Sequence, residues 1–123
     1  MSYSFNNELP IYLQLIDIYK QKFVREELSD GDQLPSVRDV ALLYGVNPNT
    51  VQKAFSELDR DGFTKSERTT GRFVTLTQER RRALQEEMAK QYLEDFLEKM
   101  RALGIEKKDI HRMIGGQQHE QTD

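Results

Sequence analysis

The sequence contains no cysteine, no tryptophan and only two histidines among its 123 residues. The lack of cysteine excludes disulfide bonds and thiolate metal sites. Neither histidine has a metal-ligand pattern around it, since His119 lies near the end of the chain and His111 has only Asp109 close in sequence. No glycine-rich phosphate loop or nucleophile motif occurs. We therefore predict that the protein is not an enzyme and holds no metal or cofactor.

Long apolar runs are also absent, so the sequence offers no segment with the length and composition of a membrane-spanning helix. The first four residues, Met1 to Ser4, lack the apolar core of a signal peptide. We expect a cytoplasmic protein that makes no membrane contact.

Positive charge is not in excess, because 18 Lys and Arg residues stand against 21 Asp and Glu residues, a net charge of −3. Residues 1–76 alone contain nine basic and eleven acidic residues, a net charge of −2. An acidic total counts against a nucleic-acid binder. Local distribution matters more, because charges beyond about 8 to 10 Å are screened at physiological salt. Between residues 65 and 72, Lys65, Arg68 and Arg72 accompany only Glu67.

The stretch from Ser36 to Gly62 has the pattern of two short helices joined by a tight turn. Ser36 is a suitable N-cap for the first helix, whose apolar residues recur at helical spacing. Gly45 follows where a left-handed C-cap is needed. Asn47 caps the second helix, and Pro48 occupies its first turn. The pattern predicts a helix-turn-helix.

The second of these helices has a polar face that can contact DNA. Steps of three and four place five side chains on one side of the helix: Asn49, Gln52, Lys53, Ser56 and Arg60. Amide and lysine side chains bond to base edges in the major groove, and Thr50 and Ser56 can reach a base or a phosphate. A solvated helix face can have the same composition, so the DNA interpretation depends on the helix-turn-helix geometry around it.

Apolar residues on both sides of the helix-turn-helix predict the rest of a small core. A long amphipathic helix begins after Pro10, with apolar residues from Ile11 to Leu28. After Gly62, two short β-prone runs around the glycine turn at Gly71 predict a hairpin. The hairpin packs through three apolar residues: Phe63, Phe73 and Val74.

The remaining residues predict two helices with more apolar surface than one small chain can bury. Thr77 caps a long helix that reaches about Leu103 and ends at Gly104. A short helix over 106–114 ends at the following pair of glycines, and it is unstable unless it docks. Docking on a second copy gives a two-fold homodimer. The predicted dimer interface comprises Leu84, Met88, Tyr92, Leu93, Phe96, Met100, Leu103, Ile110, Met113 and Ile114.

Arginines at two places have more than one interpretation. Arg72, at the tip of the hairpin, can contact the sugar-phosphate backbone or the minor groove, or it can be an ordinary surface arginine. If it contacts phosphate, Arg72→Ala weakens binding to all DNA and reduces the salt dependence. The run Arg80-Arg81-Arg82 can contact phosphate or be a solvated run of charge.

The order and spacing of certain residues between about 9 and 75 resemble the GntR family of bacterial transcription regulators. The residues that carry the resemblance are Gly31, Leu34-Pro35-Ser36, Arg38, Ala41, Gly45-Val46, Thr50-Val51, Ala54, Leu58, Gly62, Gly71 and Phe73-Val74. The phrase GVNPNTVQKAF and the short stretch after the hairpin are most similar to the small YtrA-type subfamily. Two departures from the family concern the operator sequence. Many members have an arginine at the position of Pro48 and a basic residue at that of Gln52. The wing of the family often reads Gly-x-Gly-Thr-Phe-Val, whereas this chain has Thr69-Thr70-Gly71-Arg72-Phe73-Val74.

The resemblance implies a mainly α fold: a winged helix-turn-helix domain of three helices and a two-stranded β wing, then a two-helix dimerisation region. We expect an N-terminal arm over 1–8, the winged helix over 9–76, the dimerisation region over 77–115 and a disordered tail over 116–123. Together with the polar face, the resemblance assigns DNA contacts to Ser36, Arg38, Asn47, Asn49, Thr50, Gln52, Lys53, Ser56, Gly71 and Arg72.

The function that follows is a homodimeric repressor bound to an inverted-repeat operator on double-stranded DNA. The subfamily resemblance implies control of a transporter operon. The sequence names no small-molecule effector. Two alternatives remain open: a winged-helix module that binds a protein partner, which the acidic net charge favours, and a small-ligand-sensing dimer in which DNA binding is secondary.

Overall fold

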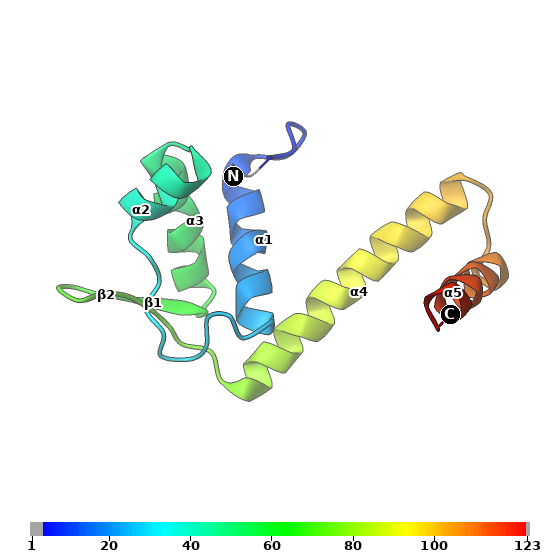
Figure 1. The fold of residues 1–123 in the computed structure, drawn as a ribbon. Coiled ribbons are helices and arrows are strands. Elements are labelled where there is room, and N and C mark those ends of the chain that lie inside the picture. Colours follow the sequence, from blue (N-terminus) through cyan, green and yellow to red (C-terminus); the bar gives the residue numbers. More distant parts are fainter. Residues whose placement is uncertain (1–3, 123) are drawn as a thin grey trace. The chain divides into compact units, whose positions relative to one another are not determined.

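The computed structural model describes residues 4–122, and side chains over 4–116. Contacts within the chain divide it into two compact units, Met1–Leu84 and Gln85–Asp123. The first unit contains three helices and a hairpin, as predicted, and is a winged helix-turn-helix (Figure 1). The predicted fold class, with two further helices toward the C-terminus, is confirmed. The boundary between the two units falls inside the helix over residues 78–102.

Helix α1 (Ile11–Val24) lies beside α3 (Pro48–Arg60) and buries Leu15, Tyr19 and Phe23. The predicted helix continued to Leu28, but the observed one ends at Val24. Glu26 follows with φ of 62°, a left-handed conformation that breaks the helical hydrogen-bond pattern. Leu28 still packs against the core from the loop.

The helix-turn-helix consists of α2 (Val37–Tyr44) and α3, and its predicted caps are present. The Ser36 side chain accepts a hydrogen bond from the Asp39 amide at 3.0 Å, and that of Asn47 accepts one from the Asn49 amide at 2.8 Å. Each such cap contributes about 1 kcal/mol to helix stability. Gly45 takes φ of 67° between the helices, where a side chain would be strained.

The core of this unit is continuous across α1, α2, α3 and the hairpin. Tyr19 and Phe55 meet edge to face, with ring centroids 5.3 Å apart, at its centre. Burial raises the pKa of the Tyr19 phenol, so the ring stays uncharged at physiological pH. The buried cluster comprises Leu15, Tyr19, Phe23, Leu34, Val40, Ala41, Val51, Ala54, Phe55, Leu58, Val74 and Leu76.

The wing is an antiparallel hairpin of β1 (Thr64–Glu67) and β2 (Gly71–Val74), in which Ser66 pairs with Arg72. Its inner edge is paired with residues 31–34. The amide of Leu34 donates to the Arg72 carbonyl at 2.8 Å. A β-bridge joins Gln33 to Phe73. The segment before α2 therefore anchors the wing to the helix-turn-helix.

Helix α4 (Gln78–Ala102) begins after Thr77, whose hydroxyl accepts a bond from the Arg80 amide at 3.2 Å, as predicted. It ends with Gly104 at φ of 77° and a bond from the Ile105 amide to the Met100 carbonyl, the expected Schellman cap. Among the described residues, no helix is long and apolar enough to cross a membrane.

Helix α5 (Lys107–Thr122) is longer than predicted. The sequence placed its end at Gly115 and Gly116, with a disordered tail over 116–123, but the helix continues through both glycines. Neither glycine has a positive φ. The prediction that the pair stops the helix is therefore wrong, and Asp123 lies outside the described residues.

Candidate nucleic-acid interface

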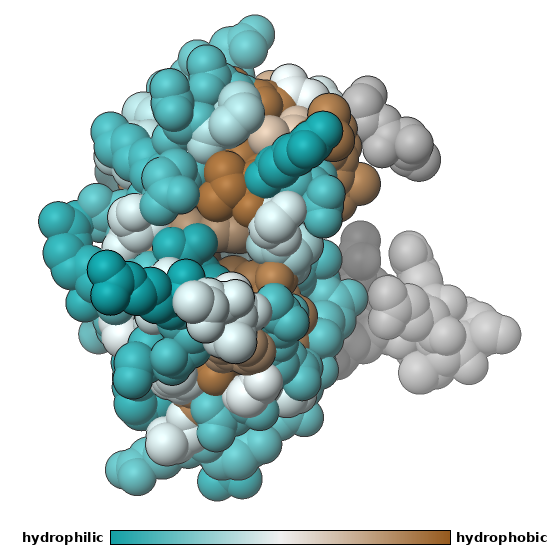
Figure 2. Space-filling view, turned by 90° about the vertical axis from the view of Figure 1, so that its left-hand side faces the viewer, coloured by the Kyte–Doolittle hydropathy of each residue, from teal (hydrophilic) through white to brown (hydrophobic). Residues whose placement is uncertain are grey.

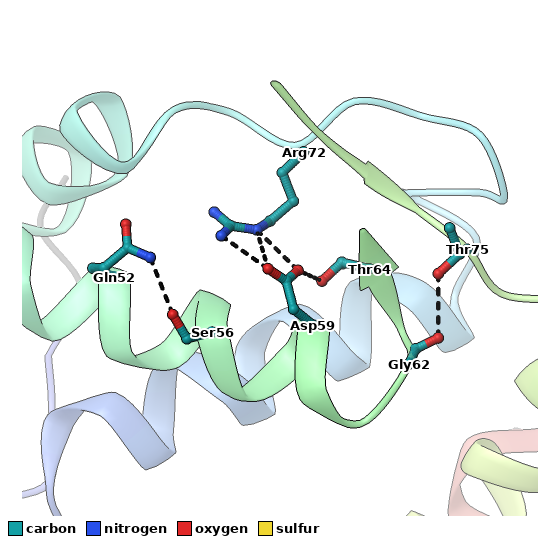
Figure 3. A network of polar contacts seen from close by, with 7 residues as sticks. All are labelled: Gln52, Ser56, Asp59, Gly62, Thr64, Arg72 and Thr75. Carbon is teal, nitrogen blue, oxygen red and sulfur yellow. Dashed lines mark hydrogen bonds and ion pairs between the residues drawn. The ribbon is translucent and has the colours of Figure 1, made fainter. Parts of the chain in front are cut away.

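The predicted polar face of α3 is present and exposed. Asn49, Gln52, Lys53, Ser56 and Arg60 are all exposed, on the side of the helix opposite its buried residues. The Gln52 amide donates to the Ser56 hydroxyl at 3.0 Å, so these two side chains lie along the helix one turn apart (Figure 3). A bond between exposed groups exchanges readily with water or a base edge. The face can therefore offer both amide donors and amide acceptors.

The two cations of this face already have neighbours within the protein. The Lys53 ammonium lies 4.0 Å from the centroid of the Tyr12 ring, a cation–π contact between α3 and α1. Arg60 forms an ion pair with Glu57, and the hydrogen bond within this pair raises the pKa of the Arg60 guanidinium. The predicted base contact by Lys53 therefore requires the side chain to leave Tyr12 or to extend past it.

Other predicted contacts lie at the N-terminal ends of α2 and α3. Ser36, Arg38 and Asn47 are exposed, and Thr50 is half-buried. The hydroxyl of Ser36 already accepts the Asp39 amide, but it retains a proton to donate. A hollow of about 230 Å³ opens between residues 33–37 and the wing. Helix N-termini attract anions, so this end of α2 suits a phosphate.

Arg72 is not at the wing tip, contrary to the sequence-based placement. The turn of the hairpin lies at residues 68–70, and Arg72 lies within β2 with its side chain 13% exposed. Its Nε is 3.0 Å from Oδ1 of Asp59, and its Nη2 is 3.0 Å from Oδ2 (Figure 3). The guanidinium also lies 5.1 Å from the Phe55 ring centroid. Thr64 donates to the same carboxylate at 2.5 Å. The residue expected to hold phosphate is thus bound to α3.

Gly71 also has a structural role at the base of the wing. Its φ is 120°, and a Cβ there would collide with Nε2 of Gln33. That amide donates to the Thr70 carbonyl at 2.9 Å, which ties the turn to the segment before α2. Only glycine permits this approach without strain. A DNA contact by Gly71 stays a prediction that its exposed backbone allows.

The basic side chains nearest the wing turn are Arg68, within it, and Lys65 on β1, and both are exposed. Lys65 is 3.8 Å from Glu67 in a solvent-exposed pair, which contributes little stability. The surface on the side that bears α2 and the wing is mainly hydrophilic, with a few hydrophobic areas (Figure 2). Arg68 was counted among the basic wing residues but was missing from the predicted contacts, because the sequence placed the turn at Gly71, whereas the observed turn spans residues 68–70.

Three residues outside the predicted contacts also shape the interface. Asp59 holds Arg72, Gln33 holds the wing turn, and Tyr12 holds Lys53. The spacing of α3 identifies Asp59 as partly exposed, but its partner depends on the strand register. No local pattern links Gln33 to the wing, 37 residues away.

The predicted dimer-interface residues divide into three groups by their exposure. Leu84 and Ile110 are 4% and 6% exposed in the single chain, so they are covered without a partner. Met88 and Met100 are half-buried. The remaining six keep between 40% and 73% of their surface exposed: Tyr92, Leu93, Phe96, Leu103, Met113 and Ile114.

The described residues contain no group of three or more side chains suited to a metal ion.

The sequence profile of "Bacterial regulatory proteins, gntR family" matches residues 11–74. The chain belongs to the GntR family. The matched segment spans α1 through β2, so it includes the helix-turn-helix and the wing. The resemblance stated from the sequence is confirmed.

Individual relatives agree over most of the chain. HTH-type transcriptional regulator YhcF of Bacillus subtilis (strain 168) is 38% identical over 110 residues, covering 89% of this chain and 91% of the relative. HTH-type transcriptional repressor YtrA of the same organism is 33% identical, covering 85% and 82%. A GntR family transcriptional regulator from Listeria monocytogenes is similar in structure, with a TM-score of 0.82 and 34% identity, covering 91% and 98%.

This GntR-family protein is a DNA-binding transcriptional regulator and not an enzyme. The small GntR subfamily that contains YhcF and YtrA is the part of the family it resembles over most of its length.

Proposed function

We propose that this GntR-family protein is a repressor that binds an inverted-repeat operator as a homodimer. The observation that carries the proposal is the exposed face of α3 with Asn49, Gln52 and Ser56, together with the exposed Arg38 at the start of α2. Amide side chains discriminate adenine in the major groove, whereas arginine at a helix start suits phosphate. Such a protein acts in the bacterial cytoplasm, where the operator is.

The assigned contacts follow from the geometry of this face. Asn49 and Gln52 read bases, and Lys53 joins them when it leaves the Tyr12 ring. Ser36, Arg38 and Thr50 hold phosphates at the ends of α2 and α3, and Arg68 takes the wing-tip position first assigned to Arg72. The role of repressor is supported by the likeness to YtrA, whose name describes a repressor. On the subfamily resemblance, the proposed target is a transporter operon.

The proposed homodimer rests on the apolar surface of the second unit. Leu93 and Phe96 on α4 are 56% and 40% exposed, and Leu103, directly after the end of this helix, is 73% exposed. Monomeric proteins rarely expose several large apolar side chains close together, because each contributes to aggregation or association. A two-fold dimer through these residues presents two copies of α3 to half-sites about 34–36 Å apart, one turn of DNA.

Selection from a pool of random double-stranded DNA tests the proposal directly. The purified protein is expected to enrich a sequence with two inverted half-sites, bound by two chains in the presence of unrelated competitor DNA. Gln52→Ala is expected to lose about 1–3 kcal/mol of discrimination at one base pair of each half-site, since one amide then no longer bonds to its base. Gln91→Ala is the matched control, because it removes the same amide group from an exposed position on α4 that is not among the assigned DNA contacts.

Enrichment of no sequence, with binding that disappears as competitor is added, would contradict the operator proposal. The chain would then fit a protein-binding module better, for which the side chains of Leu42 and Leu43, 73% and 64% exposed on α2, offer an apolar surface. Enrichment of a single half-site without a repeat would contradict the homodimer and leave the α3 contacts intact.

A further inference from the structure

The side chains of two adjacent arginines at the start of α4 are hydrogen-bonded to the C-terminal ends of two different helices. The run Arg80-Arg81-Arg82 had two interpretations in the sequence, phosphate contact or solvated charge. In the structure both guanidinium groups bond to protein carbonyls; Arg81 is half-buried, whereas Arg80 remains exposed. All of these contacts lie within the first compact unit, Met1–Leu84.

Arg80 closes the C-terminal end of α3. Its Nη1 donates to the Gly62 carbonyl at 2.8 Å and to the Thr75 carbonyl at 3.2 Å. Its Nη2 is 3.3 Å from the Asp61 carbonyl, and Asp61 is the C-cap of α3. The last carbonyls of a helix lack partners and carry partial negative charge, so a guanidinium is well suited to them.

Arg81 likewise bonds to the C-terminal end of α1. Its Nη1 donates to the carbonyl of Val24, the last residue of that helix, at 2.9 Å. Its Nε is 3.1 Å from Oε1 of Glu26, which also accepts a bond from Gln78 at 2.8 Å. Glu26 is the residue with φ of 62°, so the left-handed turn after α1 places its carboxylate toward α4. The Arg81 side chain is only 17% exposed.

Two anchors on two helices restrict the first turn of α4 more than one anchor can. A single anchor allows rotation about the point of attachment, whereas a second one on another helix removes that freedom. The linker is fixed as well, because the buried Leu76 donates its amide to Asp30 at 2.8 Å. The first turn of α4 is therefore held rigidly to the helix that reads DNA.

We propose that Arg80 and Arg81 are positioning residues that determine which spacing of operator half-sites the protein accepts. The inference rests on the proposed homodimeric, operator-binding function. The proposed dimer residues follow Leu84, so the direction in which α4 leaves the winged helix sets the separation of the two α3 helices. A change of about 10° over a lever of about 25 Å moves the end by about 4 Å. That exceeds one base-pair step of about 3.4 Å.

The absence of cysteine allows a first test without DNA. Spin labels on Ser66→Cys and Ala83→Cys, both within the first unit and in chains diluted with unlabelled protein, report the distance between the wing and the start of α4 by pulsed electron paramagnetic resonance. The labelled protein is expected to give one narrow distribution. Adding Arg80→Ala and Arg81→Ala is expected to broaden it at least twofold. Unchanged width in the double variant would overturn the proposal.

The second test measures binding to inverted repeats that share one half-site sequence and differ in spacer by single base pairs. The unmodified protein is expected to prefer one spacer by about tenfold or more, and Arg80→Ala with Arg81→Ala is expected to reduce this to threefold or less. Affinity for a single half-site stays unchanged. Arg82→Ala with Lys90→Ala, two exposed residues, removes the same charge and is expected to keep the preference.

Arg80→Lys with Arg81→Lys separates positioning from phosphate attraction. Lysine keeps the charge, but its single ammonium cannot reach the separated acceptors that Arg80 contacts from two nitrogens, so the spacer preference is expected to fall as in the alanine variant. This variant also serves if the alanine variant fails to fold. A sharp preference in the lysine variant, or its loss in the Arg82 and Lys90 control, would overturn the proposal. The distance distribution can broaden as expected while the unmodified protein selects no half-site. In that case the operator function is wrong, and the proposed role in spacing is wrong with it.

Discussion

Arg72 and Asp59 form an ion pair that joins the middle of the wing to the recognition helix α3. Two of the three guanidinium nitrogens of Arg72 donate to the carboxylate, each at 3.0 Å, while Phe55 lies against its face. The side chains are 13% and 26% exposed, so the pair is shielded more than a surface ion pair is. It stabilises the angle between wing and helix.

Arg72→Ala is expected to lower the free energy of unfolding by about 1–3 kcal/mol, because a partly buried carboxylate loses its charged donor. Arg68→Ala, at the exposed turn, is expected to change it by no more than about 0.5 kcal/mol. Urea unfolding followed by circular dichroism measures both. A double-mutant cycle with Asp59→Ala isolates the pair, and a coupling energy near zero would show that the ion pair does not stabilise the wing.

The salt dependence of DNA binding is expected to separate the same two arginines. Arg68→Ala removes an exposed cation at the wing turn, so the slope of log K against log salt is expected to fall by about one. Arg72→Ala is expected to leave the slope unchanged, although affinity decreases as the wing loosens. Arg25→Ala, in an exposed pair with Glu27 at the end of α1, controls for net charge. A smaller slope for Arg72→Ala alone would restore the original phosphate assignment.

Gly71→Ala is expected to destabilise the wing by about 1–3 kcal/mol, since φ of 120° is strained for any residue with a Cβ. Part of the cost comes from the collision with Gln33, whose amide can move away. Gln33→Ala combined with Gly71→Ala is therefore expected to cost less than the sum of the single changes. Thermal unfolding measures all three variants. Exact additivity would mean that backbone strain alone accounts for the effect.

Phe96→Glu is expected to dissociate the proposed homodimer, because it places a charge in the apolar surface of α4. Sedimentation equilibrium measures the mass directly. Glu98→Lys, two residues away and exposed, is the control and is expected to remain dimeric. A monomeric mass for the unmodified protein at micromolar concentration would contradict the homodimer without affecting the helix-turn-helix.

Gly115→Ala and Gly116→Ala are each expected to increase the helical content of α5. Both positions are helical with open space around them, and alanine favours a helix over glycine by about 1 kcal/mol. Far-UV circular dichroism of the double variant measures the change. No increase would indicate that the helix ends at the glycines, as the sequence alone suggested.

The elements that sequence predicted correctly are those fixed by neighbouring residues. Ser36 and Asn47 were identified as caps because each bonds only two or three residues away. The Schellman cap at Gly104 likewise depends on one glycine and the apolar residue after it. The exposed face of α3 followed from helical spacing.

The features that sequence could not predict depend on contacts across long separations. The pairing of Leu34 with Arg72 makes residues 31–34 an edge of the wing, yet these residues contain turn-forming types. Arg72 points to Asp59 only because the strand register places Arg72 opposite Ser66, two residues from the base of the hairpin. The end of α5 was misjudged because a pair of glycines weakens a helix without forbidding it.

Strand β1 contributes one buried side chain, Thr64, to the domain, and its other three residues are exposed. Gln52 and Ser56 likewise lie outside the packed cluster of the fold. Substitutions at Gln52 and Ser56 are thus expected to be nearly neutral for folding, while on the proposed assignment each alters the DNA sequence preferred. Descendants of one ancestral regulator can therefore diverge in the genes they control without passing through unstable intermediates.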